Sequence, residues 1–170
     1  MTISDNSKAV AYNNYIKFDK GDAFKKNEHY CKPNIVHVLM DMDFDAIMAV
    51  SNSYADLIDY WTNYLVCETD YLSFEIDELT DKMHSSDQAD SYRIIKCKTA
   101  EPLKKGMIVY VAAVGADVVY IGTSDEKAYK VLRDYLITDT DYDVEEMTEI
   151  LNAVESGELT GYTLKTITVI

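Results

Sequence analysis

The feature that most constrains the fold is an internal repeat at an offset of 71 residues. Residues 46–71 align without gaps with residues 117–142, and the Thr-Asp-Tyr block at 69–71 recurs at 140–142. Apolar character is kept where identity is lost. The matched apolar pairs are Ile47 with Val118, Val50 with Ile121, Leu57 with Ala128, Tyr60 with Val131, Trp61 with Leu132 and Val66 with Ile137. This pattern predicts one supersecondary unit used twice.

Each unit is expected to have the order β-β-α-α-β. Apolar runs at 35–38 and 108–111 predict buried strands, each followed by a turn and a second strand. Ser53 and Ser124 stand where a helix N-cap belongs. The first helix of each unit is predicted to bury Leu57, Tyr60, Trp61 and Tyr64, or Ala128, Val131, Leu132 and Tyr135. The second helix is predicted to bury Ile76, Leu79 and Met83, or Met147, Ile150 and Val154, and a strand opened by Tyr92 or Tyr162 closes each unit.

These elements predict an α+β fold of tandem pseudo-symmetric β-β-α-α-β repeats in one compact unit. The repeats are assigned to 35–98 and 108–170, with a linker at 99–107 and an N-terminal edge strand or arm at 1–34. Residues 10–18 have strand-like aromatic content, which suits an edge strand in this chain or in a partner subunit as well as a partly mobile arm. The two sheets are expected to lie side by side or back to back.

The charge balance restricts the classes of partner. Thirty Asp and Glu oppose sixteen Lys and Arg, a formal net charge of −14. Nucleic acid and anionic membranes would repel such a chain, so neither is expected as a direct partner. No apolar run reaches the length of a membrane helix or a secretory signal, which predicts a cytoplasmic protein, in the host cytoplasm if a phage encodes it. Acidity serves solubility in many proteins, and docking on a basic surface is the alternative.

Few residues of the sequence stand in the patterns typical of catalytic or metal-binding sites. The three cysteines are far apart and His37 lies within a predicted strand, where a satisfied histidine is expected. His29 and Cys31 have no spaced partner motif for zinc. Two Asp-x-Asp-x-Asp runs, at 41–45 and 139–143, lack the Gly and Glu of a calcium loop and read as solvated acidic turns. Phosphate-binding and hydrolase motifs are also absent from the sequence, so we expect no cofactor, no metal and no enzymatic activity.

Acidic residues and tyrosines cluster at related places in the two repeats. Residues 139–149 hold six carboxylates, and the first repeat has a matching acidic stretch from residue 68. Carboxylates beside tyrosine suit a protein interface against Lys and Arg. The predicted partner-binding residues are Asp139, Asp141, Tyr142, Asp143, Glu145, Glu146 and Glu149, with Glu68, Asp70 and Tyr71 as the related set.

In size, acidity and lack of catalytic motifs, the whole chain resembles small acidic accessory proteins of phages and mobile elements. Those proteins block host restriction or CRISPR enzymes, some of them by imitating DNA. The resemblance implies a non-enzymatic, anti-defence inhibitor that covers the basic nucleic-acid-binding surface of a host protein. Two alternatives remain: a ligand-binding or enzymatic module with a pocket between the repeats, and a structural or assembly subunit that forms a homodimer.

Overall fold

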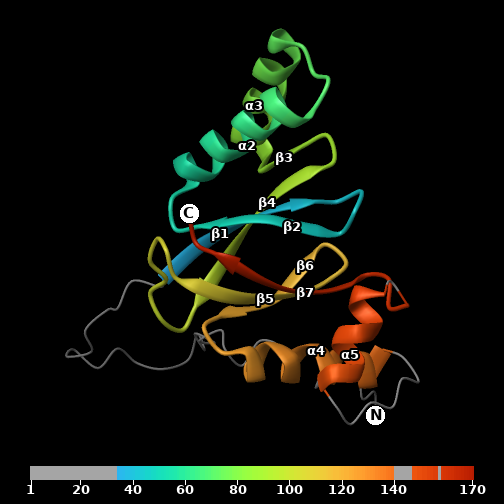
Figure 1. The fold of residues 1–170 in the computed structure, drawn as a ribbon. Helices are drawn as coiled ribbons and strands as arrows, with labels where there is room; N and C mark the ends of the chain where they lie inside the picture. Colours follow the sequence, from blue (N-terminus) through green and yellow to red (C-terminus); the bar gives the residue numbers. More distant parts are fainter. Residues whose placement is uncertain (1–33, 140–146, 157) are drawn as a thin grey trace, which may run out of the picture.

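The computed structural model describes residues 34–139, 147–156 and 158–170. Within these ranges the fold is mixed α+β, with four helices and two antiparallel sheets (Figure 1). The first part of the chain forms β1 Asn34–Asp41, β2 Ala46–Ser51, α2 Tyr54–Glu68, α3 Ser73–Ser86, β3 Gln88–Ala89 and β4 Tyr92–Thr99. The second part forms β5 Ile108–Val114, β6 Asp117–Gly122, α4 Asp125–Asp139, α5 Met147–Glu155 and β7 Tyr162–Thr168. The predicted N-terminal arm lies outside the described residues up to residue 33.

Each sheet takes its strands from one part of the chain. The first has the order β2-β1-β4-β3 and the second the order β6-β5-β7. The middle strands β1 and β5 are each flanked by the strand that follows them and by a strand that returns after two helices. The two-residue strand β3 pairs only with the start of β4, and nothing in the sequence indicated it.

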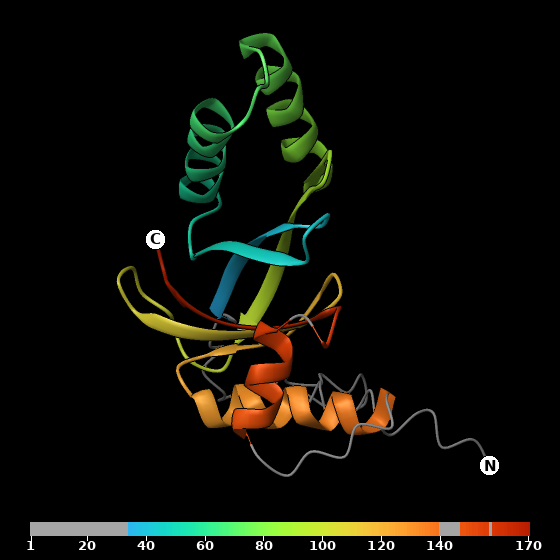
Figure 2. The ribbon, with the colours of Figure 1, turned by 45° about the vertical axis from the view of Figure 1, so that its right-hand side comes forward.

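The sheets pack face to face, and helices cover their outer faces (Figures 1 and 2). Successive side chains of a strand point to opposite faces. On β1, Val38 and Met40 therefore enter the core between the sheets, while Leu39 enters the core beneath α2 and α3. Because β1 is buried on both faces, its sequence is a continuous apolar run. Of the two predicted arrangements, the back-to-back one is observed.

The core between the sheets also extends to the edge where β2 meets β7. Val50 and Val169 form a parallel bridge, and Lys165 Nζ donates a hydrogen bond of 2.7 Å to the Ile47 carbonyl. The buried members of this core are Val36, Val38, Met40, Ile47, Val50, Cys97, Leu103, Val109, Val111, Ala113, Ile121 and Val169. Neither sheet could expose these residues alone without a large loss of hydrophobic stabilisation, so the two sheets depend on each other.

The predicted N-caps of α2 and α4 are confirmed. Ser53 Oγ accepts the amide of Asp56, and Ser124 Oγ accepts the amide of Lys127, each at 3.2 Å. Such a cap satisfies one of the backbone donors that the first turn leaves free.

The predicted buried face of α2 is wrong at Tyr60, which is 38% exposed. The buried residues are Leu57, Ile58, Trp61 and Leu65. At about 100° per residue these span one arc of the helix, and Tyr60 lies about 60° outside it. On α3 the predicted Ile76, Leu79 and Met83 are all buried, and on α5 Ile150 is buried while Val154 is half-buried.

None of the helices in the described ranges is both long and apolar enough to cross a membrane.

Candidate protein-interaction surface

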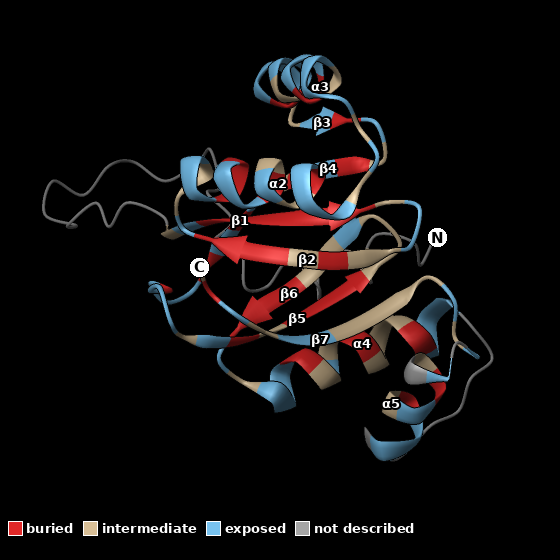
Figure 3. Cartoon of the chain, turned by 45° about the horizontal axis from the view of Figure 1, so that its top comes forward, coloured by how far each residue is buried: buried red, intermediate tan, exposed pale blue. Residues whose placement is uncertain are grey.

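Three connections of the first sheet meet at one end of it, on the right-hand side of Figure 3. They are the β1–β2 turn at 42–45, the α2–α3 connection at 69–72 and the β3–β4 turn at 90–91. The Met42 amide donates to the Ser91 carbonyl at 2.7 Å, and the Tyr71 hydroxyl donates to the Asp90 carboxylate. The strand register causes this convergence, because Asp41 at the end of β1 pairs with Tyr92 at the start of β4.

These connections and their flanks are strongly acidic. We define the acidic end as residues 41–45, 68–75 and 90–91, which contain seven carboxylates and no Lys or Arg. The carboxylates are Asp41, Asp43, Asp45, Glu68, Asp70, Glu75 and Asp90. All except Asp41 are at least partly exposed. The buried Asp41 shapes the turn, since its Oδ1 accepts the amide of Asp43 at 3.0 Å.

The titration of Tyr71 reports the negative field of this end. Its hydrogen bond to Asp90, partial burial and the negative charges of Asp90, Glu75 and Asp43 together raise the pKa of Tyr71 to about 12. The charges contribute because they oppose a phenolate. Carboxylates from the β1–β2 turn, the β3–β4 turn and the first turn of α3 therefore act on one hydroxyl.

Large apolar side chains project among the carboxylates. Phe44 at the tip of the β1–β2 turn is 81% exposed, and Phe74 in the first turn of α3 is 61% exposed. Leu72 and Val66, at the start of α3 and the end of α2, are also more than half exposed. Exposed large apolar groups are the informative exceptions on a soluble surface, and here they share one end of the molecule with the carboxylates.

A rigid aromatic group lies beneath the acidic end. Trp61 is fully buried and its ring meets that of Tyr92 edge-on, with centroids 5.6 Å apart. The ring of Tyr64 meets Tyr92 at 6.2 Å. Burial, followed by the effects of Tyr64 and Asp41, raises the pKa of Tyr92, so this hydroxyl stays neutral. The packing holds the C-terminal half of α2 on the sheet and fixes the position of the α2–α3 connection.

One described carboxylate of the second part of the chain, that of Asp139, lies on the same side of the molecule. Thr163 Oγ1, near the start of β7, donates to the Asp45 carbonyl at 2.9 Å. Burial raises the pKa of the neighbouring Tyr162, and the negative charge of Asp139 raises it further. Asp139 ends α4 and is exposed, so its carboxylate lies on the same side as the β1–β2 turn.

The predicted partner-binding residues fall into three groups. Glu68, Asp70 and Tyr71 lie in the acidic end, where the fold brings Tyr71 together with Asp90 and within the field of Asp43. Asp139 and Glu149 are exposed on α4 and α5. The remaining predicted residues lie outside the described residues: Asp141, Tyr142, Asp143, Glu145 and Glu146.

Sequence reasoning missed the contributions of Phe44 and Asp90. The run at 41–45 is interpreted from the sequence as a solvated turn; in the structure Asp43 also acts on Tyr71 of the α2–α3 connection, and Phe44 is 81% exposed. A phenylalanine between two aspartates in a turn is the signal that could have indicated a contact residue, because a turn gives an aromatic ring nothing of its own to pack against.

Other chemical groups do not form a site in the described ranges. No three residues among the described His, Cys, Asp and Glu lie close enough to hold a metal ion. His29 and Cys31 lie outside the described residues. His37 is buried on β1 as predicted, but the prediction that it is satisfied is wrong, because its Nδ1 has no hydrogen-bond partner.

No protein-family model, no curated protein and no solved structure matches this chain.

Proposed function

We propose that this chain is a non-enzymatic interaction protein whose acidic end docks on a basic surface of another protein. The single observation that carries the proposal is the composition of that end: seven carboxylates, no Lys or Arg, and the exposed rings of Phe44 and Phe74. Carboxylates steer a basic partner into place and form bidentate contacts with arginine. Apolar anchors supply the burial that charge alone does not supply.

The exposed rings are large enough to matter energetically. A fully buried aromatic side chain removes roughly 150–250 Å² from water. At about 25 cal/mol per Å², covering the exposed parts of Phe44 and Phe74 would contribute on the order of 2–5 kcal/mol each before the costs of association. A solvated acidic face needs no such side chains, so their presence favours docking over solubility as the role of this end.

We also propose that the two sheets and their helices are copies of one unit. The elements follow the order β-β-α-α-β in both, apart from the short β3, and the middle strand is the first in both. A β-bulge follows Leu39 in β1 and Ala112 in β5, at matching places in the two pairings. Helices α2 and α4 have equal length and serine caps 71 residues apart. Duplication explains why both copies direct carboxylates to the same end.

The partner class we propose first is a host enzyme with a basic nucleic-acid-binding groove. The basis is the resemblance of the chain to acidic accessory proteins of phages and mobile elements that block restriction or CRISPR enzymes. In this proposal the acidic end occupies the groove, excludes DNA or RNA, and acts in the host cytoplasm. The space between the sheets is filled by apolar side chains, which is not what a ligand pocket between the repeats would require.

The test is a capture experiment with matched charge variants. Tagged protein is incubated with bacterial lysate, and captured proteins are identified by mass spectrometry. The acidic-end variant carries D43N, E68Q and D70N, and the control variant carries D59N, D81N and E126Q. All six positions are exposed, and both variants lose three negative charges.

The proposal expects a partner with a basic groove that the wild type and the control variant retain and the acidic-end variant loses. The purified partner should also release a labelled DNA or RNA duplex when the wild type is added. Equal retention by both variants would contradict docking through the acidic end. Capture without displacement of nucleic acid would contradict the groove-blocking role alone.

A further inference from the structure

Three buried polar atoms in the described ranges have no hydrogen-bond partner: His37 Nδ1, Trp61 Nε1 and Tyr129 Oη. Of these groups only the imidazole changes its charge near neutral pH. The His37 side chain is 9% exposed, so it cannot turn to water for a partner. Because its Nδ1 has no hydrogen-bond partner, the buried His37 side chain is sensitive to protonation.

His37 lies where the helix layer meets the first sheet. On β1 it pairs with Ser51 of β2 on one side and with Lys96 of β4 on the other. The ring of Tyr54, in the first turn of α2, meets the His37 ring edge-on at 5.5 Å. The exposed His84, in the last turn of α3, lies against Tyr54 at 5.8 Å.

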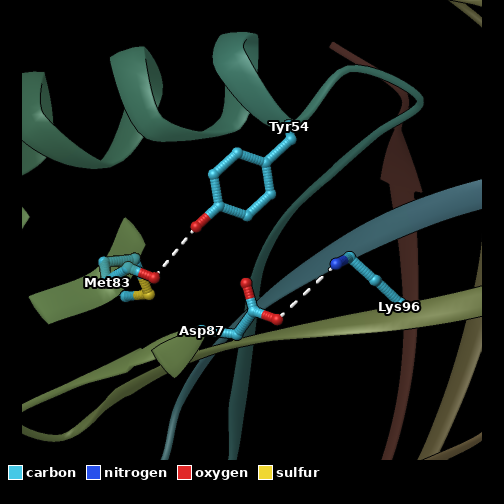
Figure 4. Close-up of polar contacts among 4 residues, drawn as sticks. All are labelled: Tyr54, Met83, Asp87 and Lys96. Carbon is cyan, nitrogen blue, oxygen red and sulfur yellow. Dashed lines mark hydrogen bonds and ion pairs between the residues drawn. The ribbon is translucent and has the colours of Figure 1, made fainter. Parts of the chain in front are cut away.

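Four contacts beside His37 tie this layer together, and Figure 4 shows the two that side chains make. Tyr54 Oη donates to the Met83 carbonyl at 3.0 Å, which joins the start of α2 to the end of α3. The Asp87 carboxylate lies 3.7 Å from Lys96 Nζ, which joins the residue after α3 to β4. The backbone of Asp87, in the left-handed region, donates to Met83 and accepts from Ile94.

The charges around His37 favour its neutral form in this arrangement. Burial lowers the pKa of His37 from its ordinary value of 6.5, and the Lys96 ammonium lowers it further. The Asp87 carboxylate and a hydrogen bond with the Ser51 backbone act in the opposite direction and are outweighed. Protonation would leave a buried N–H without an acceptor beside a second cation.

The sign of the pH effect follows from this lowered pKa. Below pH 6.5 an opened state, in which His37 reaches water, binds more protons than the closed state. Acid therefore favours opening. The contribution of His37 to the closed state is complete above pH 6.5 and is lost as the pH falls toward the lowered value.

We propose that His37, Tyr54, Asp87 and Lys96 form a proton-sensitive latch that holds α2 and α3 on the first sheet and releases them in mild acid. The latch is a local device, because α4 and α5 cover the other sheet. Tyr110, in the middle strand of that sheet, pairs with Gly122 and Thr166 as His37 pairs with Ser51 and Lys96, so the second sheet has no imidazole at the matching place. The further consequence, that acid weakens docking through residues 68–75, rests on the proposed function, whereas the latch itself does not.

The single tryptophan provides the readout, since Trp61 lies on α2 and is buried between this helix and the first sheet. Acrylamide quenching and the emission maximum of Trp61 are measured from pH 7.5 to pH 5.0, with amide exchange of β5 and β7, corrected for intrinsic rates, as the internal control. The opening equilibrium should rise up to about tenfold per pH unit below 6.5, while β5 and β7 stay protected. Equal loss of protection in both sheets, or no change at Trp61, would overturn the proposal.

Variants separate a latch from a merely structural contact. H37Q should remove the acid response, and H84Q, at an exposed histidine, should leave it intact. D87N removes the carboxylate that raises the pKa of His37 and should strengthen the response, whereas K96Q removes the cation that lowers it and should weaken the response. Both D87N and K96Q break the same ion pair. If this pair had only a structural role, the two variants would change the opening equilibrium equally at every pH. That result would refute the latch even if H37Q fails to fold.

Discussion

Replacing Ile47 with alanine tests whether the two sheets share one core. Ile47 is fully buried between the sheets, and the substitution removes three carbon atoms from that core. At about 0.8 kcal/mol per carbon the transfer cost is about 2.4 kcal/mol, and the residual cavity brings the expected loss to about 3–4 kcal/mol. A domain of this size has a total stability on the order of 5–15 kcal/mol, so the effect should be large.

The assay is urea unfolding followed by Trp61 fluorescence for the first sheet and by amide exchange of β5 and β7 for the second. We expect I47A to lower both stabilities together, although Ile47 belongs to the first sheet. I35A is the matched control, because Ile35 is 45% exposed on the neighbouring strand and its truncation should cost less than about 1 kcal/mol. If I47A destabilises only the part that Trp61 reports, the argument for a shared core fails.

Three further predictions concern single groups. S53A and S124A should each lower the free energy of unfolding by about 1 kcal/mol, because each removes a helix cap. Thermal denaturation should show additive effects in the double variant, and a double variant as stable as wild type would contradict this. Burial raises the pKa of Cys97 to about 12, so at pH 8 an aromatic disulfide reagent should modify the exposed Cys67 quickly and Cys97 only after unfolding. Peptide mass mapping identifies the labelled cysteine, and rapid labelling of Cys97 in the native protein would show that its burial is wrong. Spectrophotometric titration of wild type against Y71F should assign to Tyr71 an ionisation near pH 12, and an assignment near 10 would remove the evidence for the negative field.

Much of the fold could be predicted because local signals agree with it. The strands beginning near residues 35 and 108 are apolar runs buried on both faces, and Ser53 and Ser124 carry a capping signal that needs no tertiary information. The offset of 71 holds for β2 and β6 and for the capping serines, whereas the closing strands, which begin at Tyr92 and Tyr162, are offset by 70. The first strands are offset by 73 instead, because the first hairpin turn has four residues, 42–45, and the second has two.

The candidate surface was only partly predictable, because its parts are distant in the sequence. Glu68, Asp70 and Tyr71 form a local acidic and aromatic signal, but the contact between Tyr71 and Asp90 depends on how β3 returns beneath α3. The orphaned nitrogen of His37 was equally hidden. Whether a buried polar group is satisfied depends on neighbours from three other elements rather than on its own strand.

The most direct test of the central claim is the salt dependence of the association rate for the captured partner. Surface-immobilised partner is exposed to the wild type, to the D43N/E68Q/D70N variant and to the D59N/D81N/E126Q control between 50 and 500 mM NaCl (roughly 14 to 4 Å of screening length). We expect a steep fall in rate with salt for the wild type and the control, and a slower rate with a shallower salt dependence for the acidic-end variant. Identical salt slopes for all three proteins would contradict it.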